Sequence, residues 1–186
     1  MFARGTHWKS LYRTDREFYE LCYWRAVEVY GNEYDYPEDG PAEIEVVFGS
    51  RMSTLTLDLI DGEAISLFSW GYCGYLALAL HELTGHPLAL FTNPQRSLER
   101  GWSGHAAVML PDGSFLDIEG VATAAEINRR YGFKEPVEPT IPELDEYLVT
   151  MFDKEDVGNP YRALDPLELR LLRHFAELVV RQYGLS

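Results

Sequence analysis

Two residues that can carry nucleophilic chemistry, Cys73 and His105, stand at informative positions in the sequence. Cys73 follows Ser69 to Tyr72 (SWGY) and directly precedes a run with helical periodicity. At the start of a helix, free backbone N–H groups and the positive end of the helix dipole favour a thiolate and can also donate to an oxyanion. His105 opens Gly104 to Val108 (GHAAV), which is typical of a core strand and would hold a base rigidly. The pair predicts attack of a cysteine on an amide or related acyl carbon.

A carboxylate shortly after His105 supplies the expected third member of a catalytic triad. Pro111 to Gly113 (PDG) predicts a type I turn with glycine in the left-handed position, which joins two strands through a three-residue loop. In that register Asp117 and Glu119 share the face of His105, whereas a two-residue loop would turn both acids away. We favour Asp117, because apolar neighbours surround it and a buried acid requires a partner. Glu119 remains the second choice.

Other cysteines and histidines in the chain fit structural roles better. Cys22 falls in the middle of an expected helix, as a small core residue. His81 and His86 resemble the histidines of a zinc-protease helix, but their separation of five residues, instead of four, places them on different faces. His7 lies near the terminus and His174 on a late helix. We therefore expect no metal site and no cofactor.

The periodicity of apolar residues predicts a single α+β domain over residues 1–186. The turn-rich segment Gly31–Gly40 predicts an exposed loop. The expected helices are Thr14–Tyr30, Gly74–Thr84, Ala122–Tyr131, Ile141–Phe152 and Pro166–Tyr183, the last with Asp165 as its cap. The expected strands are Glu43–Phe48, Leu55–Ile60, Leu88–Phe91, Gly104–Leu110 and Ser114–Ile118.

Composition excludes several classes of function. The net charge of −14 and pI near 4.7 argue against nucleic-acid binding, which depends on Lys and Arg. No segment approaches the ~18 continuous apolar residues that span a bilayer, and the first ten residues lack the apolar core of a signal peptide. With two cysteines, no dense disulfide framework is expected. These features favour a cytoplasmic protein that does not bind membranes.

The order of Cys73, His105 and Asp117 resembles that of the papain-like superfamily in its broad sense. Gly71 to Pro87 (GYCGYLALALHELTGHP), with Gly104 to Val108 and Asp112 to Asp117 (DGSFLD), is similar to transglutaminase-like and papain-like-toxin deamidase cores. The resemblance implies a nucleophile helix packed on a small antiparallel sheet, with extra C-terminal helices in this chain. It also implies a side-chain oxyanion donor before the cysteine, yet no Gln or Asn occurs between Arg51 and Cys73.

The leading expectation is a thiol hydrolase or acyltransferase, such as a protein deamidase, thiol protease or cross-linking enzyme, acting on a protein or peptide through a thioester. We expect Trp70, Gly71, Tyr72, Trp102 and Ser103 to contact the substrate, because they flank the two catalytic elements. The alternative is an inactive papain-like module, an inhibitor or assembly protein whose acidic surface captures a basic protein.

Overall fold

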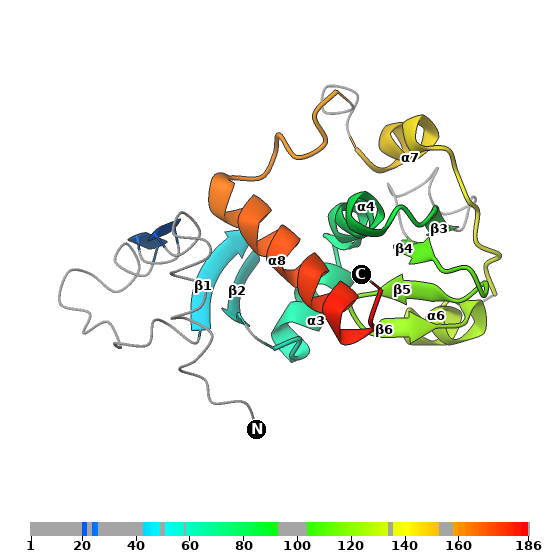
Figure 1. Ribbon diagram of the computed structural model, residues 1–186, viewed down its shortest axis with the longest axis horizontal. Coiled ribbons are helices and arrows are strands. Elements are labelled where there is room, and N and C mark those ends of the chain that lie inside the picture. The colour runs from blue at the N-terminus through cyan, green and yellow to red at the C-terminus, as the bar shows by residue number, and fades with distance from the viewer. Residues whose placement is uncertain are drawn as a thin grey trace.

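The computed structural model describes residues 20–21, 24–25, 43–48, 51–57, 59–92, 104–133, 136–152 and 158–185. Within them the chain folds into an α+β arrangement (Figure 1). The helices are α3 (Gly62–Ser69), α4 (Cys73–Thr84), α6 (Ala124–Arg130), α7 (Leu144–Met151) and α8 (Pro166–Gln182). The strands are β1 (Glu43–Phe48), β2 (Arg51–Thr56), β3 (Leu88–Thr92), β4 (Gly104–Met109), β5 (Phe115–Asp117) and β6 (Gly120–Ala122).

The described strands form two antiparallel sheets. β1 pairs with β2 as a hairpin, and β3, β4, β5 and β6 follow one another in the larger sheet. The outer edge of β3 is covered in part, because Leu90 and Thr140 exchange backbone hydrogen bonds of 2.9 Å in both directions. Pairing of this kind protects an edge strand from unwanted association.

The turn between β4 and β5 has the predicted geometry. Leu110 N–H donates to the Ser114 carbonyl at 2.8 Å, and Gly113 has the left-handed φ of 83° that the predicted turn requires. In the ladder, Val108 faces Leu116 and Met109 faces Phe115. The three-residue loop is confirmed, and with it the register that brings Asp117 to the face of His105.

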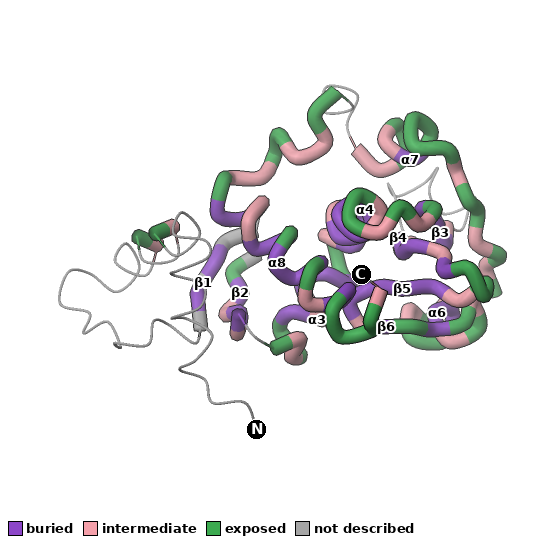
Figure 2. The backbone as a smooth tube through the Cα atoms, viewed as in Figure 1, coloured by how far each residue is buried: buried purple, intermediate pink, exposed green. Residues whose placement is uncertain are grey.

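Each face of the larger sheet carries its own apolar cluster. Alternating residues such as Leu90, Ala106 and Val108 join the main core, which also contains the buried faces of α4 and α8. Their neighbours, including Ala107 and Phe115, join a smaller cluster with Ile127 of α6. The strands β4 and β5 are buried on both faces and are therefore mostly purple in Figure 2. The sheet is therefore a rigid support for any side chain mounted on it.

The starts of α6 and α8 and the end of α4 follow the capping rules. Asp165 caps α8 and Thr123 caps α6, each in a reciprocal capping box with the glutamate three residues later. α4 ends at Gly85, whose φ of 70° is left-handed. None of the helices among the described residues has the length and apolar character needed to cross a membrane.

Several boundaries differ from the sequence predictions. The second strand begins at Arg51 and ends at Thr56, instead of spanning Leu55–Ile60, because pairing with β1 extends it toward the hairpin. α3 was not predicted, although Asp61 caps it by accepting the N–H groups of Glu63 and Ala64. Short β6 was also missed, and α6 and α7 begin two and three residues later than expected, at Ala124 and Leu144.

The predicted helix Thr14–Tyr30 lies largely outside the described residues, and the predicted loop Gly31–Gly40 lies wholly outside them. The described parts of the predicted helix, residues 20–21 and 24–25, are helical. Leu21 packs against the main core, and Arg25 forms a 3.0 Å ion pair with Asp165 at the start of α8.

Candidate active site

Cys73 is the first residue of α4 and is buried, with 2% of its surface exposed. Tyr72 occupies the N-cap position but provides no side-chain hydrogen bond to the helix. The first backbone amides of a helix have no partner within the helix, and in α4 the N-cap side chain does not supply one. An uncapped helix start beside a thiol is suited to stabilising negative charge.

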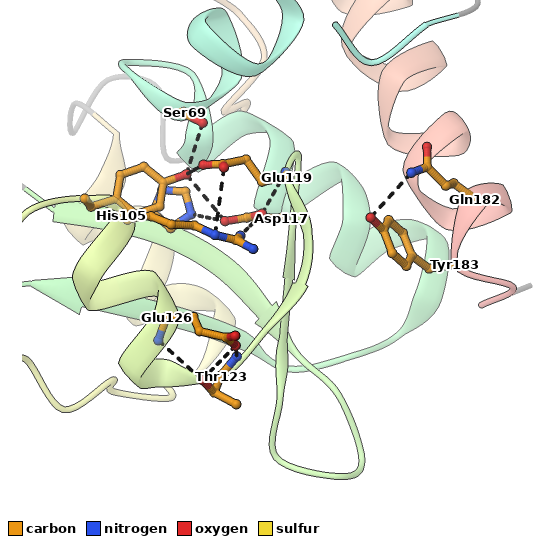
Figure 3. A network of polar contacts seen from close by, with 10 residues as sticks. Ser69, His105, Asp117, Glu119, Thr123, Glu126, Gln182 and Tyr183 are labelled. Carbon is orange, nitrogen blue, oxygen red and sulfur yellow. Dashed lines mark hydrogen bonds and ion pairs between the residues drawn. The ribbon is translucent and has the colours of Figure 1, made fainter. Parts of the chain in front are cut away.

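His105 and Asp117 form a buried pair on neighbouring strands. Nε2 of His105 lies 2.9 Å from Oδ2 of Asp117, and the two side chains are 0% and 2% exposed. Figure 3 shows both side chains in one polar network with Glu119 and Ser69. The pairing fixes which nitrogen is occupied: Nε2 faces the acid, so Nδ1 is the nitrogen left for chemistry.

The environment of His105 favours the imidazolium. Burial by itself lowers the pKa of His105, but the hydrogen bond with Asp117 and the neighbouring Cys73 thiol outweigh it and raise the pKa from 6.5 to about 9. Among the described residues, Nδ1 has no hydrogen-bond partner. The influence of Cys73 on the pKa of His105 indicates that its thiol lies beside the imidazole. At neutral pH the ring is therefore protonated at both nitrogens, and the N–H group at Nδ1 has no acceptor among the described residues.

Asp117 is held from both carboxylate oxygens. Oδ1 accepts the backbone N–H of Glu119 at 2.8 Å and lies 3.8 Å from Nη1 of Arg130, while Oδ2 faces His105. Glu119, the second choice for this role, is not the carboxylate that pairs with Nε2 of His105, and its Oε2 lies 3.8 Å from Nε of Arg130. A backbone donor and a cation stabilise a buried carboxylate, which would otherwise be costly.

Tyr131, the C-cap residue of α6, belongs to the site, although no sequence pattern selected it. Its ring stacks on the imidazole of His105 with centroids 3.8 Å apart and an interplanar angle of 18°. Its hydroxyl donates to Oγ of Ser69 at 3.0 Å and lies 3.4 Å from Asp117 and from Glu119. The only prior signal was an aromatic residue at the end of a predicted helix.

Of the predicted substrate-contacting residues, the three that precede Cys73 are described by the structure and the two that precede His105 are not. Trp70 is 63% exposed and its ring lies 5.8 Å from that of Tyr131, so it stands at the surface beside the site. Gly71 adopts a φ of 121°, which side chains rarely tolerate, with open space where a Cβ would lie. Tyr72 stacks on Tyr75 at 5.8 Å. Trp102 and Ser103 lie outside the described residues.

Among the described residues that precede Cys73, no Gln or Asn is present to serve as the side-chain oxyanion donor that the resemblance implies. Ser69 is buried, and its hydroxyl accepts the hydrogen bond of Tyr131. Most of the surface of Trp70 is exposed to solvent. The backbone amides at the start of α4 are the donors that the geometry offers.

α7 packs against the first turn of α4. The hydroxyl of the fully buried Tyr147 donates to the Gly74 carbonyl at 2.8 Å. A Cβ on Gly74 would lie 2.3 Å from the terminal methyl of Met151, so glycine permits this close approach. The contact fixes the direction of the helix that carries Cys73.

Two other histidines, His81 and His174, have structural partners. His81 uses Nδ1 to bond the His86 carbonyl at 2.7 Å, closing the end of α4, and buried His174 bonds the Leu57 carbonyl. Across the described residues there is no group of three or more His, Cys, Asp or Glu side chains able to hold a metal ion.

Comparison with protein-family models, with curated proteins and with solved structures finds no match to this chain. The function must therefore be argued from the geometry of Cys73, His105 and Asp117.

Proposed function

We propose that the protein is a cysteine-dependent enzyme that attacks an amide carbonyl and forms a thioester, with Cys73 as nucleophile, His105 as acid and base, and Asp117 as the residue that orients His105. We further propose that its sheet and nucleophile helix form a papain-like core. The observation that carries the proposal is the buried imidazole of His105, which is held by Asp117 through Nε2, is influenced by Cys73, and keeps Nδ1 without a partner among the described residues.

The first half of the reaction uses a thiolate and an imidazolium. The Cys73 sulfur donates an electron pair to the carbonyl carbon, and the carbonyl π electrons move to oxygen, where backbone amides of α4 stabilise the charge. When the tetrahedral intermediate collapses, the C–N bond breaks and the leaving nitrogen takes the proton from Nδ1 of His105. A pKa of about 9 keeps that proton available at neutral pH.

The second half restores the enzyme. Neutral His105 removes a proton from water or from an acceptor amine, which attacks the thioester carbon, and the S–C bond breaks to release the Cys73 thiolate. Asp117 stays ionised and fixes the orientation of the ring throughout. Water as acceptor gives deamidation or peptide cleavage, and an amine gives cross-linking.

Burial of the nucleophile favours a second function. Cys73 is 2% exposed, and a protein substrate must reach its sulfur. A protein that retains the fold without turnover would instead use its surface, which belongs to a chain of net charge −14, to capture a basic protein.

Alkylation of the two cysteines distinguishes the two functions. We would treat the protein with a limiting amount of iodoacetamide between about pH 5.5 and 9 and locate the label on Cys73 or Cys22 by peptide mass spectrometry. The enzyme predicts fast labelling of Cys73 that is nearly independent of pH and that His105→Ala abolishes. Slow labelling of both cysteines, rising with pH as free thiols do, would contradict it.

Products identify the reaction. Wild-type and Cys73→Ala proteins are incubated with a cell lysate, and peptide masses are compared. Gains of about one dalton indicate deamidation, new termini indicate cleavage, and joined peptides indicate cross-linking. If no product depends on Cys73 while a basic protein is retained equally by both forms, the binding function is the correct one.

A further inference from the structure

Tyr131 connects the two halves of the candidate site. One half is the segment from Ser69 to Cys73, which delivers the nucleophile from α3 into α4. The other half is the pair of His105 on β4 and Asp117 on β5. Tyr131 touches both halves, because its ring stacks on the imidazole and its hydroxyl donates to Ser69.

The ring of Tyr131 limits the motion of His105. Near-parallel stacking at 3.8 Å covers one face of the imidazole, while Asp117 holds its Nε2 edge. A hydrogen bond at one edge leaves a ring free to tilt about that bond, and a flat neighbour in van der Waals contact removes this freedom. The two contacts together fix the direction of Nδ1.

The hydroxyl of Tyr131 has one hydrogen and three acceptors within reach. Ser69 Oγ is nearest at 3.0 Å, and carboxylate oxygens of Asp117 and Glu119 each lie at 3.4 Å. Burial, followed by the charge of Asp117, raises the pKa of Tyr131 well above its ordinary value of 10. The hydroxyl therefore remains a donor at every pH at which a thiolate and an imidazolium coexist.

Ser69 is the acceptor with the clearest consequence. It is the last residue of α3, buried, and four positions before Cys73. A bond from Tyr131 to Ser69 therefore fixes the start of the turn that leads to the nucleophile, relative to the imidazole on which Tyr131 stacks.

We propose that Tyr131 is a positioning residue that sets the separation of Cys73 from His105, with its ring fixing the imidazole and its hydroxyl holding Ser69. This role rests on the proposed thiolate and imidazolium chemistry, in which Tyr131 neither donates nor accepts a proton and acts only by holding His105 and Ser69 in place. The hydrogen bond from Tyr131 to Ser69 then serves to align Cys73 with His105.

Two variants remove this bond from opposite ends. Tyr131→Phe keeps the stacked ring and deletes the donor, and Ser69→Ala deletes the acceptor. We expect each to slow alkylation of Cys73 by about fivefold to tenfold, the range that one hydrogen bond provides, and the double variant to be no slower than either single one. Tyr161→Phe is the matched control, because it removes a buried tyrosine hydroxyl whose pKa is raised by burial and then by Glu82, not by Asp117 or Glu119.

A second readout separates alignment from loss of stability. Because the Cys73 thiol raises the pKa of His105, Cys73→Ala should lower that pKa, as measured by NMR titration of the imidazole. In the Tyr131→Phe and Ser69→Ala backgrounds this effect of Cys73→Ala should shrink, since the thiol lies farther from the ring. Urea unfolding confirms that each variant is folded, and Ser69→Ala provides the test if Tyr131→Phe is not.

Wild-type rates and an undiminished effect of Cys73→Ala in both variants would overturn the positioning role. Slower alkylation with an undiminished effect would also overturn it, because alignment must change the coupling of Cys73 with His105. Failure of the proposed function looks different, since Cys73→Ala would then leave the pKa of His105 unchanged in the wild-type background.

Discussion

Raising the pH through the titration of His105 should remove a defined part of the protein's stability. The pKa of His105 is about 9 in the folded protein, against 6.5 for an unperturbed histidine. The folded state thus binds this proton more tightly than the unfolded state does. The stabilisation is complete below pH 6.5 and is lost as the pH rises through 9. A difference of 2.5 between the two values, at about 1.4 kcal/mol for each pH unit, corresponds to about 3 kcal/mol.

Urea unfolding of wild-type and His105→Gln proteins between about pH 5.5 and 9.5 measures this loss. The window stops below the ordinary tyrosine pKa of 10. Groups that do not interact with His105 titrate in both proteins, so the difference between the two free energies of unfolding isolates His105 together with its coupling to Asp117 and Cys73. We expect the wild-type protein to lose about 3 kcal/mol relative to the variant across the window.

The Cys73→Ala protein separates the two causes of the raised pKa. Without the thiol, only Asp117 opposes burial, so the loss of stability with pH should be smaller than in the wild-type protein. Parallel curves for wild-type and His105→Gln proteins would refute the reasoning. A wild-type advantage that grows with pH would refute it more strongly, because it would require an imidazole that is neutral in the folded state.

Three substitutions test other parts of the structure. Asp117→Asn removes the carboxylate that favours the imidazolium, so NMR titration should find the pKa of His105 well below 9, and a value still near 9 would show that the thiol alone maintains it. Gly104→Ala places a Cβ 2.3 Å from the Phe91 carbonyl oxygen, a backbone atom, so urea unfolding should show a loss of about 1–3 kcal/mol, and no loss would mean that the strands separate freely. Asp165→Ala deletes the cap of α8 and should cost about 1 kcal/mol by urea unfolding, whereas Asp165→Asn should retain most of it; equal losses would assign the effect to charge.

Local sequence signals predicted those elements whose ends are set by local chemistry. α8 begins at Pro166 after its Asp165 cap, and α4 ends before Gly85, as expected from capping preferences. β2 was misplaced because Arg51 and its neighbours are polar enough to resemble a turn, and only pairing with β1 makes them a strand. Tertiary pairing of this kind overrides local preference.

The contact between His105 and Asp117 was predictable because it depends on a turn of three residues. Once the loop at Pro111–Gly113 sets the register, the side-chain faces of both strands follow. The choice of Asp117 over Glu119 depended on how β5 ends. Asp117 pairs with Gly120, so the chain reverses there and carries Glu119 into the turn, away from the ladder. That reversal has a weaker sequence signal, and the contact of Tyr131 with His105 depends on how α6 packs on the sheet.

Nδ1 of His105 has no hydrogen-bond partner in the described part of the chain, and stability alone does not explain this. A buried polar atom without a hydrogen bond costs about 1–3 kcal/mol, and well-packed apolar residues often replace a buried ion pair without loss. The site nevertheless surrounds this ring with Asp117, Tyr131 and the Cys73 thiol, which fix its orientation and favour its proton. A proton that must pass to a leaving group and return is best held on a nitrogen such as Nδ1, for which the described residues offer no other acceptor. The feature that weakens the fold is therefore the one that the proposed reaction requires.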